Sequence, residues 1–312
     1  MRLGFLKMLF PVIILLVNID VQGQSTLFIV SKDNNQPLPY ASVVNHTYHQ
    51  LLFSNENGKV EHEFKAGDSI SISYVGYRNQ SFIFNGKEIL SIKLSMQPSK
   101  LTEITLHACK KWEKQSYTNL EGDSSGMTFG GLRWIENSLN AKVAILLTSA
   151  DTKSYLTDFS FWLQKSDFGN PSSFKAPIKF SFYELNDSTG LPGNLISAKQ
   201  IIYHPKKTGK QTINADSLSI KMPEKGMYLC FEIPFDKKFT QRVKILTDDN
   251  RDGMVHYFYG GRLEGIYSKK NVLSFFDYLQ NNWHFAINST KEDMYKTHGT
   301  IKFAYTMKTC AE

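Results

Sequence analysis

Short runs of alternating apolar and polar residues, separated by turn-forming residues, constrain the first third of this chain most strongly. In Ser69–Val75 each large apolar side chain is preceded by a serine, so a strand here would bury one face and leave the other in water. Similar runs follow at short intervals, and the turns between them are Asn57-Gly58, Gly67-Asp68 and Asn85-Gly86. This spacing predicts an antiparallel β-sandwich.

The expected sandwich occupies residues 25–108. Its predicted strands are Leu27–Val30, Tyr40–Val44, Lys59–Phe64, Ser69–Val75, Ser81–Phe84, Leu90–Leu94 and Leu101–Leu106. The whole chain is rich in aromatic residues, with 22 Phe and 15 Tyr. Such side chains pack well on a pleated sheet, which also favours a β-structure.

Four segments of this region carry a resemblance to a known family. They are Pro37–Val43 (PLPYASV), Ser54–Lys59 (SNENGK), Gly67–Ile70 (GDSI) and Ser73–Tyr77 (SYVGY), in that order, and Leu101–Leu106 follows as a closing strand. Together they resemble the carboxypeptidase regulatory-like domain of Gram-negative envelope proteins. The resemblance implies a prealbumin-like sandwich of seven strands that is non-catalytic. In the receptors of this family a plug and barrel follow, and this chain departs from them after residue 108.

The N-terminus has the pattern of an export signal. Arg2 and Lys7 precede the apolar run Met8–Val17, which is too short to span a bilayer comfortably. We therefore expect residues 1–24 to be a signal peptide, with an uncleaved membrane anchor as the alternative. The expected location is the periplasm, the outer membrane or the cell surface.

The remaining charges and cysteines exclude some classes of protein. The net charge is +7, and the lysines occur only in short, scattered clusters, so we expect no nucleic-acid partner. The three cysteines are Cys109, Cys230 and Cys310. In an oxidising compartment one pair could form a disulfide, and the sequence leaves open which. Cys230 lies in a strand pattern and is expected to be a packed side chain.

A polar stretch without strand periodicity, residues 109–125, is the expected linker. Residues 126–312 are then predicted to form a second, jelly-roll-like β-sandwich. Its predicted strands are Ala141–Thr148, Tyr155–Leu163, Pro177–Leu185, Leu195–Tyr203, Ser217–Ile220, Gly226–Ile233, Arg242–Leu246, Met254–Tyr259, Trp283–Ile287 and Thr300–Met307. Ile178–Leu195, Pro223–Ile233 and Asn282-Trp283 resemble segments of secreted jelly-roll domains, whose activity is generally unassigned.

One motif suggests nucleophilic catalysis. Gly122–Gly126 (GDSSG) matches the Gly-x-Ser-x-Gly pattern around a catalytic serine. Such a serine needs a buried strand before it and a helix after it. The flanking residues here are polar or glycine-rich, so a flexible linker is the favoured interpretation of Ser124.

A second motif suggests a metal ion. Asp248, Asn250 and Asp252, followed by Gly253, match the first half of a calcium loop. The glutamate expected at the twelfth position is replaced by Tyr259. We expect a tight turn and no tight calcium site, so that no cofactor is predicted.

A set of aromatic residues in the second sandwich is the remaining candidate site. Alternation places Tyr257 and Tyr259 on one face of a strand, and Trp134, Arg262 and Trp283 could extend that surface. Sugar rings stack on such platforms, although aromatic residues in a sandwich more often belong to its core.

These observations favour a non-catalytic, exported envelope protein that acts as an interaction module. The expected partner is a glycan or another envelope protein, and association with the outer membrane and the oligomeric state stay open. The alternatives are a secreted hydrolase with an unrecognised site and a structural accessory of an outer-membrane complex.

Overall fold

The computed structural model describes residues 25–97, 109, 111–120, 128–130, 142–149, 153–165, 173–234, 237–245, 254–259, 262–268, 273–278, 280–285 and 298–311. Within these ranges the chain is built from strands and three short 3-10 helices, which confirms the expected all-β class. No helix in the same ranges has the length and apolar character needed to cross a membrane. The expected signal peptide, residues 1–24, and the expected strand Leu101–Leu106 lie outside the described residues.

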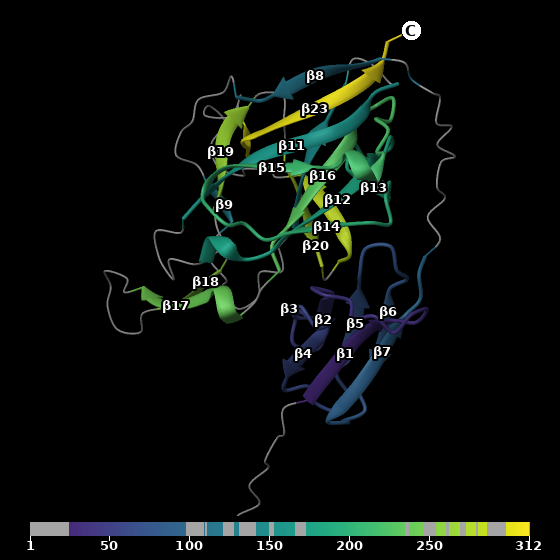
Figure 1. The fold of residues 1–312 in the computed structure, drawn as a ribbon. Coiled ribbons are helices and arrows are strands. Elements are labelled where there is room, and N and C mark those ends of the chain that lie inside the picture. The colour runs from purple at the N-terminus through teal and green to yellow at the C-terminus, as the bar shows by residue number, and fades with distance from the viewer. Residues whose placement is uncertain are drawn as a thin grey trace, which may run out of the picture.

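The first sandwich contains two sheets (Figure 1). One sheet has the order β4 (Lys59–His62), β1 (Ser25–Ser31), β7 (Ile89–Leu94); the other has the order β3 (Gln50–Phe53), β2 (Ser42–Asn45), β5 (Ser69–Ser73), β6 (Gln80–Ile83). The expected seven-stranded sandwich is therefore confirmed. Purely antiparallel pairing is wrong, because β1 and β7 run parallel. Strand β3 was not predicted either, because its four residues are too few to show a clear period.

Alternation explains which side chains form the first core. Ile70 and Ile72 of β5 are fully buried, whereas the serines between them are half-buried or point to the other side. They pack in one cluster with residues of β1 and β7, such as Leu27 and Leu94. Gly58 adopts a φ of +70°, and a Cβ at this position would lie 2.5 Å from the carbonyl oxygen of Ile29. Only glycine fits this turn without a shift of the backbone.

The second sandwich also has two large sheets, which lie one behind the other in Figure 1. The first runs β13 (Pro192–Leu195), β12 (Ile178–Leu185), β16 (Met227–Glu232), β10 (Lys142–Leu147), β20 (Ser274–Asp277), β21 (Asn282–Phe285), and β14 (Ile201–Tyr203) also pairs with β12. The second runs β22 (His298–Ile301), β19 (Arg262–Ser268), β11 (Tyr155–Gln164), β23 (Phe303–Cys310), β8 (Trp112–Thr118), with β15 (Gly209–Asn214) on β11 and β9 (Thr128–Gly130) on β19. A separate hairpin consists of β17 (Thr240–Ile245) and β18 (Met254–Tyr259).

The core of the second sandwich fills the space between these sheets. Phe159 and Phe161 of β11 meet Phe180 of β12 and Phe231 of β16 in edge-on or tilted ring contacts. Every second residue of β16 joins this core, so the residues between them face the other side of the sheet. That outer face carries Tyr228, Cys230 and Glu232, of which the first two form a small cluster with Ala144.

Part of the expected linker belongs to the second sandwich. Residues 112–118 form β8, an edge strand that pairs with β23 along its whole length. Its residues are almost all exposed, which explains why the stretch shows no apolar period. Next to this strand, Cys109 and Cys310 form a disulfide, and Cys230 is free and buried, as expected. The C-terminal end of the sandwich is thus tied to its first strand.

Two further strand predictions need correction. The expected strand Ser217–Ile220 is not a strand: its first two residues lie in the 3-10 helix Asp216–Leu218, and Ser219 ends that helix with a left-handed φ of 50°. The expected strand Leu195–Tyr203 is divided between β13 and β14. Strands β8, β9, β15, β19 and β20 were not predicted. The other two 3-10 helices are Ser173–Lys175 and Lys237–Phe239.

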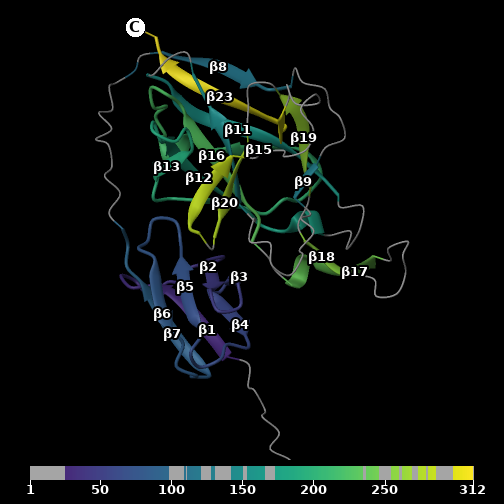
Figure 2. The same ribbon diagram turned by 180° about the vertical axis from the view of Figure 1, so that it is seen from behind.

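The two sandwiches are docked against each other, with the first below the second in both ribbon views (Figures 1 and 2). Gly76, in the turn after β5, lies so close to the second sandwich that a Cβ would be 2.5 Å from the carbonyl oxygen of Ala198. Val44, Leu51 and Phe53 of the first sandwich share an apolar cluster with Tyr278 of the second. The Ser73–Tyr77 motif therefore forms part of the contact between the sandwiches.

Candidate functional site

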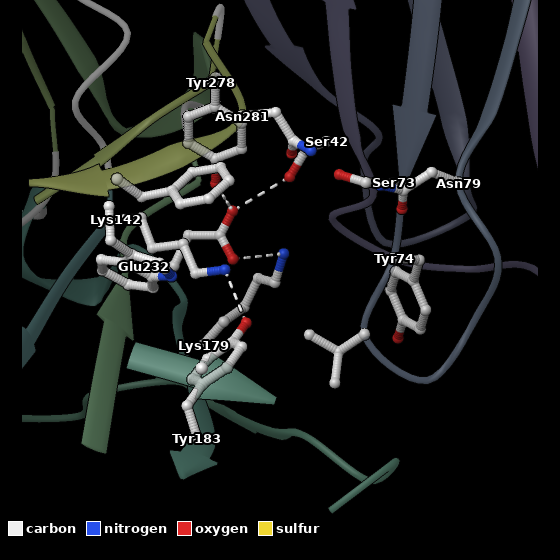
Figure 3. Close-up of a pocket in the computed structure, with 14 residues that line it drawn as sticks. Ser42, Ser73, Tyr74, Asn79, Lys142, Lys179, Tyr183, Glu232, Tyr278 and Asn281 are labelled. Carbon is white, nitrogen blue, oxygen red and sulfur yellow. Dashed lines mark hydrogen bonds and ion pairs between the residues drawn. The ribbon is translucent and has the colours of Figure 1, made fainter. Parts of the chain in front are cut away.

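A pocket of about 310 Å³ lies where the two sandwiches meet (Figure 3). The first sandwich contributes β2, the end of β5 and the turn after it; the second contributes the outer face of its β10–β12–β16 sheet and the β20–β21 hairpin. The lining residues are Ser42, Ser73, Tyr74, Val75, Asn79, Lys142, Lys179, Tyr183, Gly193, Glu232, Phe276, Tyr278, Asn281 and Trp283. Pockets of this size accept small organic ligands.

Strand register places three charged residues in one row at the base of the pocket. Glu232, at the end of β16, lies directly opposite Lys142 on β10 and directly opposite Lys179 on β12. Cross-strand partners point to the same face of a sheet, so the carboxylate stands between the two ammonium groups. All three side chains are buried, with 3% exposure for Glu232 and Lys179 and 8% for Lys142.

The carboxylate of Glu232 is held from both sandwiches. Its Oε2 pairs with Lys179 Nζ at 2.8 Å. Its Oε1 accepts hydrogen bonds from Ser42 Oγ, at 3.0 Å, and from the hydroxyl of Tyr278. The dashed lines in Figure 3 trace these contacts. A buried carboxylate needs such partners. Without them, moving the charged group out of water would cost roughly several kcal/mol of free energy.

Lys179 also connects the sandwiches. Its Nζ donates a hydrogen bond of 2.7 Å to the carbonyl oxygen of Tyr40, which belongs to the first sandwich. Tyr40 has a left-handed φ of 58°, and this turn directs its carbonyl to the lysine. The ammonium thus has a carboxylate partner on one side and a backbone acceptor on the other.

Lys142 has a different environment. Its Nζ donates a hydrogen bond of 2.7 Å to the hydroxyl of Tyr183. Three rings surround the same atom, with centroids at 4.9 Å for Tyr183, 4.8 Å for Phe276 and 5.3 Å for Trp283. Aromatic faces attract a cation, so they compensate part of the cost of burying this ammonium group.

The charges of the row influence one another. Burial alone would raise the pKa of Glu232, but Lys179, Lys142 and the hydrogen bonds hold it below its ordinary value. Burial opposes the charge of Lys142, yet its neighbours Tyr183, Cys230 and Glu232 raise its pKa overall. Burial and the adjacent Glu232 raise the pKa of Tyr278 well above its ordinary value, so that its hydroxyl remains a donor. At neutral pH the row contains an ionised carboxylate and a charged Lys142.

None of these three residues was predicted from the sequence as a site residue, although the sequence contains a signal for them. Lys142, Lys179 and Glu232 each interrupt or end an apolar strand run, in KVAILL, IKFSF and YLCFE. A charged residue within such a run is rarely buried without a partner. Three such charged residues on neighbouring, paired strands would have indicated this site. Which strands pair, however, is known only from the fold.

The structure does not bring the expected aromatic platform together. Tyr257 and Tyr259 lie on the β17–β18 hairpin, Arg262 lies on β19 opposite Gln164, and Trp283 lies on β21 in another sheet. Trp283 alone of these reaches the pocket, where its ring packs against Phe276 and Tyr183. Trp134 is outside the described residues.

Two other expected motifs also fall outside the described residues: the calcium-like residues Asp248, Asn250 and Asp252, and Ser124 with its neighbours. In the part of the chain that is described, no group of three or more His, Cys, Asp or Glu residues is placed to hold a metal ion. Cys230 is poorly suited as a nucleophile, because burial raises the pKa of its thiol to about 12.

Comparison of the chain with known proteins finds only weak structural matches. No protein-family model matches the chain, and no curated protein matches it. A crystal structure of the cysteine protease and lectin-like domains of Cwp84, a surface layer associated protein of Clostridium difficile, aligns with 92% of this chain at 12% identity and a TM-score of 0.37. A second structure of this clostridial cysteine protease, after propeptide cleavage, aligns with 92% of the chain at 10% identity and a TM-score of 0.38. The chain spans 59% of the first structure and 71% of the second.

This comparison contradicts the main functional expectation from the sequence. The aligned structures are described as a cysteine protease, one of them together with its lectin-like domains, and not as a purely non-catalytic interaction module. The likeness is too weak to assign a residue or a reaction to this chain.

Proposed function

We propose that this chain is a hydrolase, with its reacting groups in the pocket between the two sandwiches. The observation that carries the proposal is the chain of contacts from Ser42 through Glu232 to Lys179 and Tyr278. A hydroxyl within hydrogen-bond reach of a base, with the base oriented by a third group, is the general arrangement of an activated nucleophile. Here all four groups also line one pocket.

In the proposed reaction, Ser42 Oγ attacks the carbonyl carbon of an ester or amide and gives its proton to Glu232 Oε1. The same proton then passes to the leaving group as the bond to that group breaks. In a second step water attacks the resulting acyl-serine and gives a proton to Glu232, which passes it to Ser42 Oγ as the acyl bond breaks, so that both side chains return to their starting states. Lys179 and Tyr278 orient the carboxylate, and the reaction uses only side chains of this chain, without a cofactor.

The low pKa of Glu232 has a kinetic consequence. Because the two lysines keep the carboxylate ionised, the proton acceptor is present at neutral and mildly acidic pH. An acceptor with a low pKa is also a weak base, so the proposed turnover is slow. We expect the rate to fall only in acid, as pH drops through the lowered pKa of Glu232.

The test is a hydrolysis survey with aryl esters and anilides, using the full chain. We expect one substrate class to be turned over, and Ser42→Ala to lower kcat at least about a hundredfold. Ser73→Ala is the matched control, since Ser73 lines the same pocket and has no contact with Glu232 among the described interactions. If folded protein hydrolyses none of these substrates, or if both variants behave alike, the proposal is wrong.

We also propose that the chain is exported. The apolar N-terminal run and the Cys109–Cys310 disulfide support this, because disulfides persist in oxidising compartments. Periplasm, outer membrane and cell surface are all compatible with these features. The first sandwich is proposed to be a carboxypeptidase regulatory-like domain, supported by its seven strands and its SYVGY turn. An envelope protein or a glycan is then the proposed source of the substrate.

A further inference from the structure

The two lysines of the charged row differ in their partners. Lys179 is neutralised by the Glu232 carboxylate at 2.8 Å. For Lys142, no carboxylate in the described part of the chain lies within ion-pairing distance, and its polar partner is the neutral hydroxyl of Tyr183. A buried ammonium group with aromatic rings around it and no counterion in contact is only partly compensated.

The charge of the pocket follows from this difference. Two lysines and one glutamate line it, so with all three groups charged the lining carries one formal positive charge. The rest of the lining is uncharged and consists of aromatic rings, serines and asparagines, together with Val75 and Gly193. Such a site disfavours cations and has one cationic group available to pair with a small anion.

We propose that the pocket recognises a substrate bearing one carboxylate group, which pairs with the ammonium group of Lys142. This inference rests on the proposed function, because it names the substrate class of the same pocket. The rings of Phe276 and Trp283 contact the body of the ligand. Asn79 and Asn281, which come from opposite sandwiches, supply hydrogen bonds to its polar groups. The pocket volume of about 310 Å³ limits the bound part to a small organic group.

Two sources carry this chemistry, namely a peptide carboxylate and an acidic sugar. They are distinguished with two pairs of probes, N-acetyl-L-phenylalanine with its amide and glucuronate with glucose. Binding is measured by calorimetry on the full chain carrying Ser42→Ala, which removes turnover. We expect one acid to bind at least about tenfold more tightly than its neutral partner, because only the acid pairs with Lys142.

Substitutions assign this preference to a residue. We expect Lys142→Met to abolish the preference for the acid and Lys142→Arg to retain part of it. Lys210→Met is the matched control, since Lys210 is an exposed lysine over the ring of Trp162 in another sheet. Thermal unfolding of each variant shows that it is folded. Should Lys142→Met fail to fold, the Lys142→Arg variant and the salt dependence of acid binding carry the test.

The outcomes separate this inference from the proposed function. Acid-selective binding that depends on Lys142, without hydrolysis of any substrate by the unmodified chain, supports the inference and contradicts the hydrolase. Hydrolysis that depends on Ser42 but is indifferent to a carboxylate on the substrate and to Lys142 overturns the inference alone. Equal binding of acids and neutral partners, or no binding of either acid, also overturns it.

Discussion

Ser42 and Glu232 are separated by 190 residues in the sequence and belong to different sandwiches, yet a buried hydrogen bond of 3.0 Å joins them. The bond exists only because the first sandwich is docked on the outer face of the β10–β12–β16 sheet. The proposed active site is therefore shared: the first sandwich contributes the hydroxyl, and the second contributes the carboxylate with its two lysines. Whatever loosens the docking should disrupt the site as well as the fold.

Gly76 offers a test of this docking. We expect Gly76→Ala to lower the free energy of unfolding by about 2–4 kcal/mol, because alanine adds backbone strain at a φ of +82° and a clash with the Ala198 carbonyl oxygen. Gly67→Ala is the matched control. Its φ is +97°, but a Cβ there meets nothing within 4 Å, so it measures the strain without the clash.

Urea unfolding of the two glycine variants measures how much each substitution lowers the free energy of unfolding. The account predicts that Gly76→Ala costs clearly more than Gly67→Ala and also lowers hydrolysis. Equal destabilisation by the two variants would mean that the turn after β5 does not rest on the second sandwich in solution.

The Lys179–Glu232 pair should show strong coupling. Glu232→Gln leaves Lys179 buried beside a neutral group, and Lys179→Met leaves the carboxylate without its nearest cation. We expect each single change to cost about 3–5 kcal/mol and the double variant to cost less than the sum. A double-mutant cycle by urea unfolding measures the coupling; additive costs would contradict the pairing.

The pH dependence of stability follows from the sign of the Glu232 shift. The folded-state pKa of Glu232 lies below its ordinary value of 4.5, so its contribution to stability is present above pH 4.5 and is lost as pH falls through the folded value. We expect the free energy of unfolding to decrease in this acid range, and Glu232→Gln to reduce the decrease. Unfolding at a series of pH values from 7 to about 3 checks this. Identical acid profiles of the two proteins would contradict it.

The Cys109–Cys310 disulfide links residues 201 positions apart. Closing so long a loop restricts the unfolded chain strongly, and the loop-entropy relation sets an upper value of roughly 5 kcal/mol. We expect the Cys109→Ser, Cys310→Ser double variant to lose a large part of that stability. Cys230→Ala, at a buried free thiol, is the control and should lose less. Unfolding of the double variant at the same denaturant concentration as the unmodified chain would contradict the pairing.

The fold was largely predictable where one face or both faces of a strand are buried. β5, β10, β11, β12 and β16 follow their apolar patterns closely, because burial selects the side chains that face each core. Edge strands such as β8 were not predictable, because their residues face water on both sides and show no alternation of apolar and polar residues. The parallel pairing of β1 with β7 was also missed, because it depends on which strands meet and leaves no local pattern.

The site was not predictable from motifs. The residues proposed to react or to carry charge are Ser42 on β2, Lys142 on β10, Lys179 on β12, Glu232 on β16 and Tyr278 directly after β20, and none of them belongs to a recognisable sequence motif. The aromatic residues gave a stronger pattern, but alternation along one strand does not reveal which sheet that strand joins. Trp283 was predicted to be part of an aromatic surface that binds sugar rings. In the fold its ring instead packs beside the ammonium group of Lys142.

The most direct test of the central claim is covalent labelling of Ser42. An activated serine reacts with a fluorophosphonate probe, in which the serine oxygen displaces fluoride from phosphorus while its proton is taken up by the base. The account predicts that the full chain is labelled at Ser42, as located by peptide mass analysis, and that Glu232→Gln abolishes the labelling while Ser73→Ala does not. Folded protein that remains unlabelled at Ser42, or that is labelled equally in the Glu232→Gln variant, would contradict it.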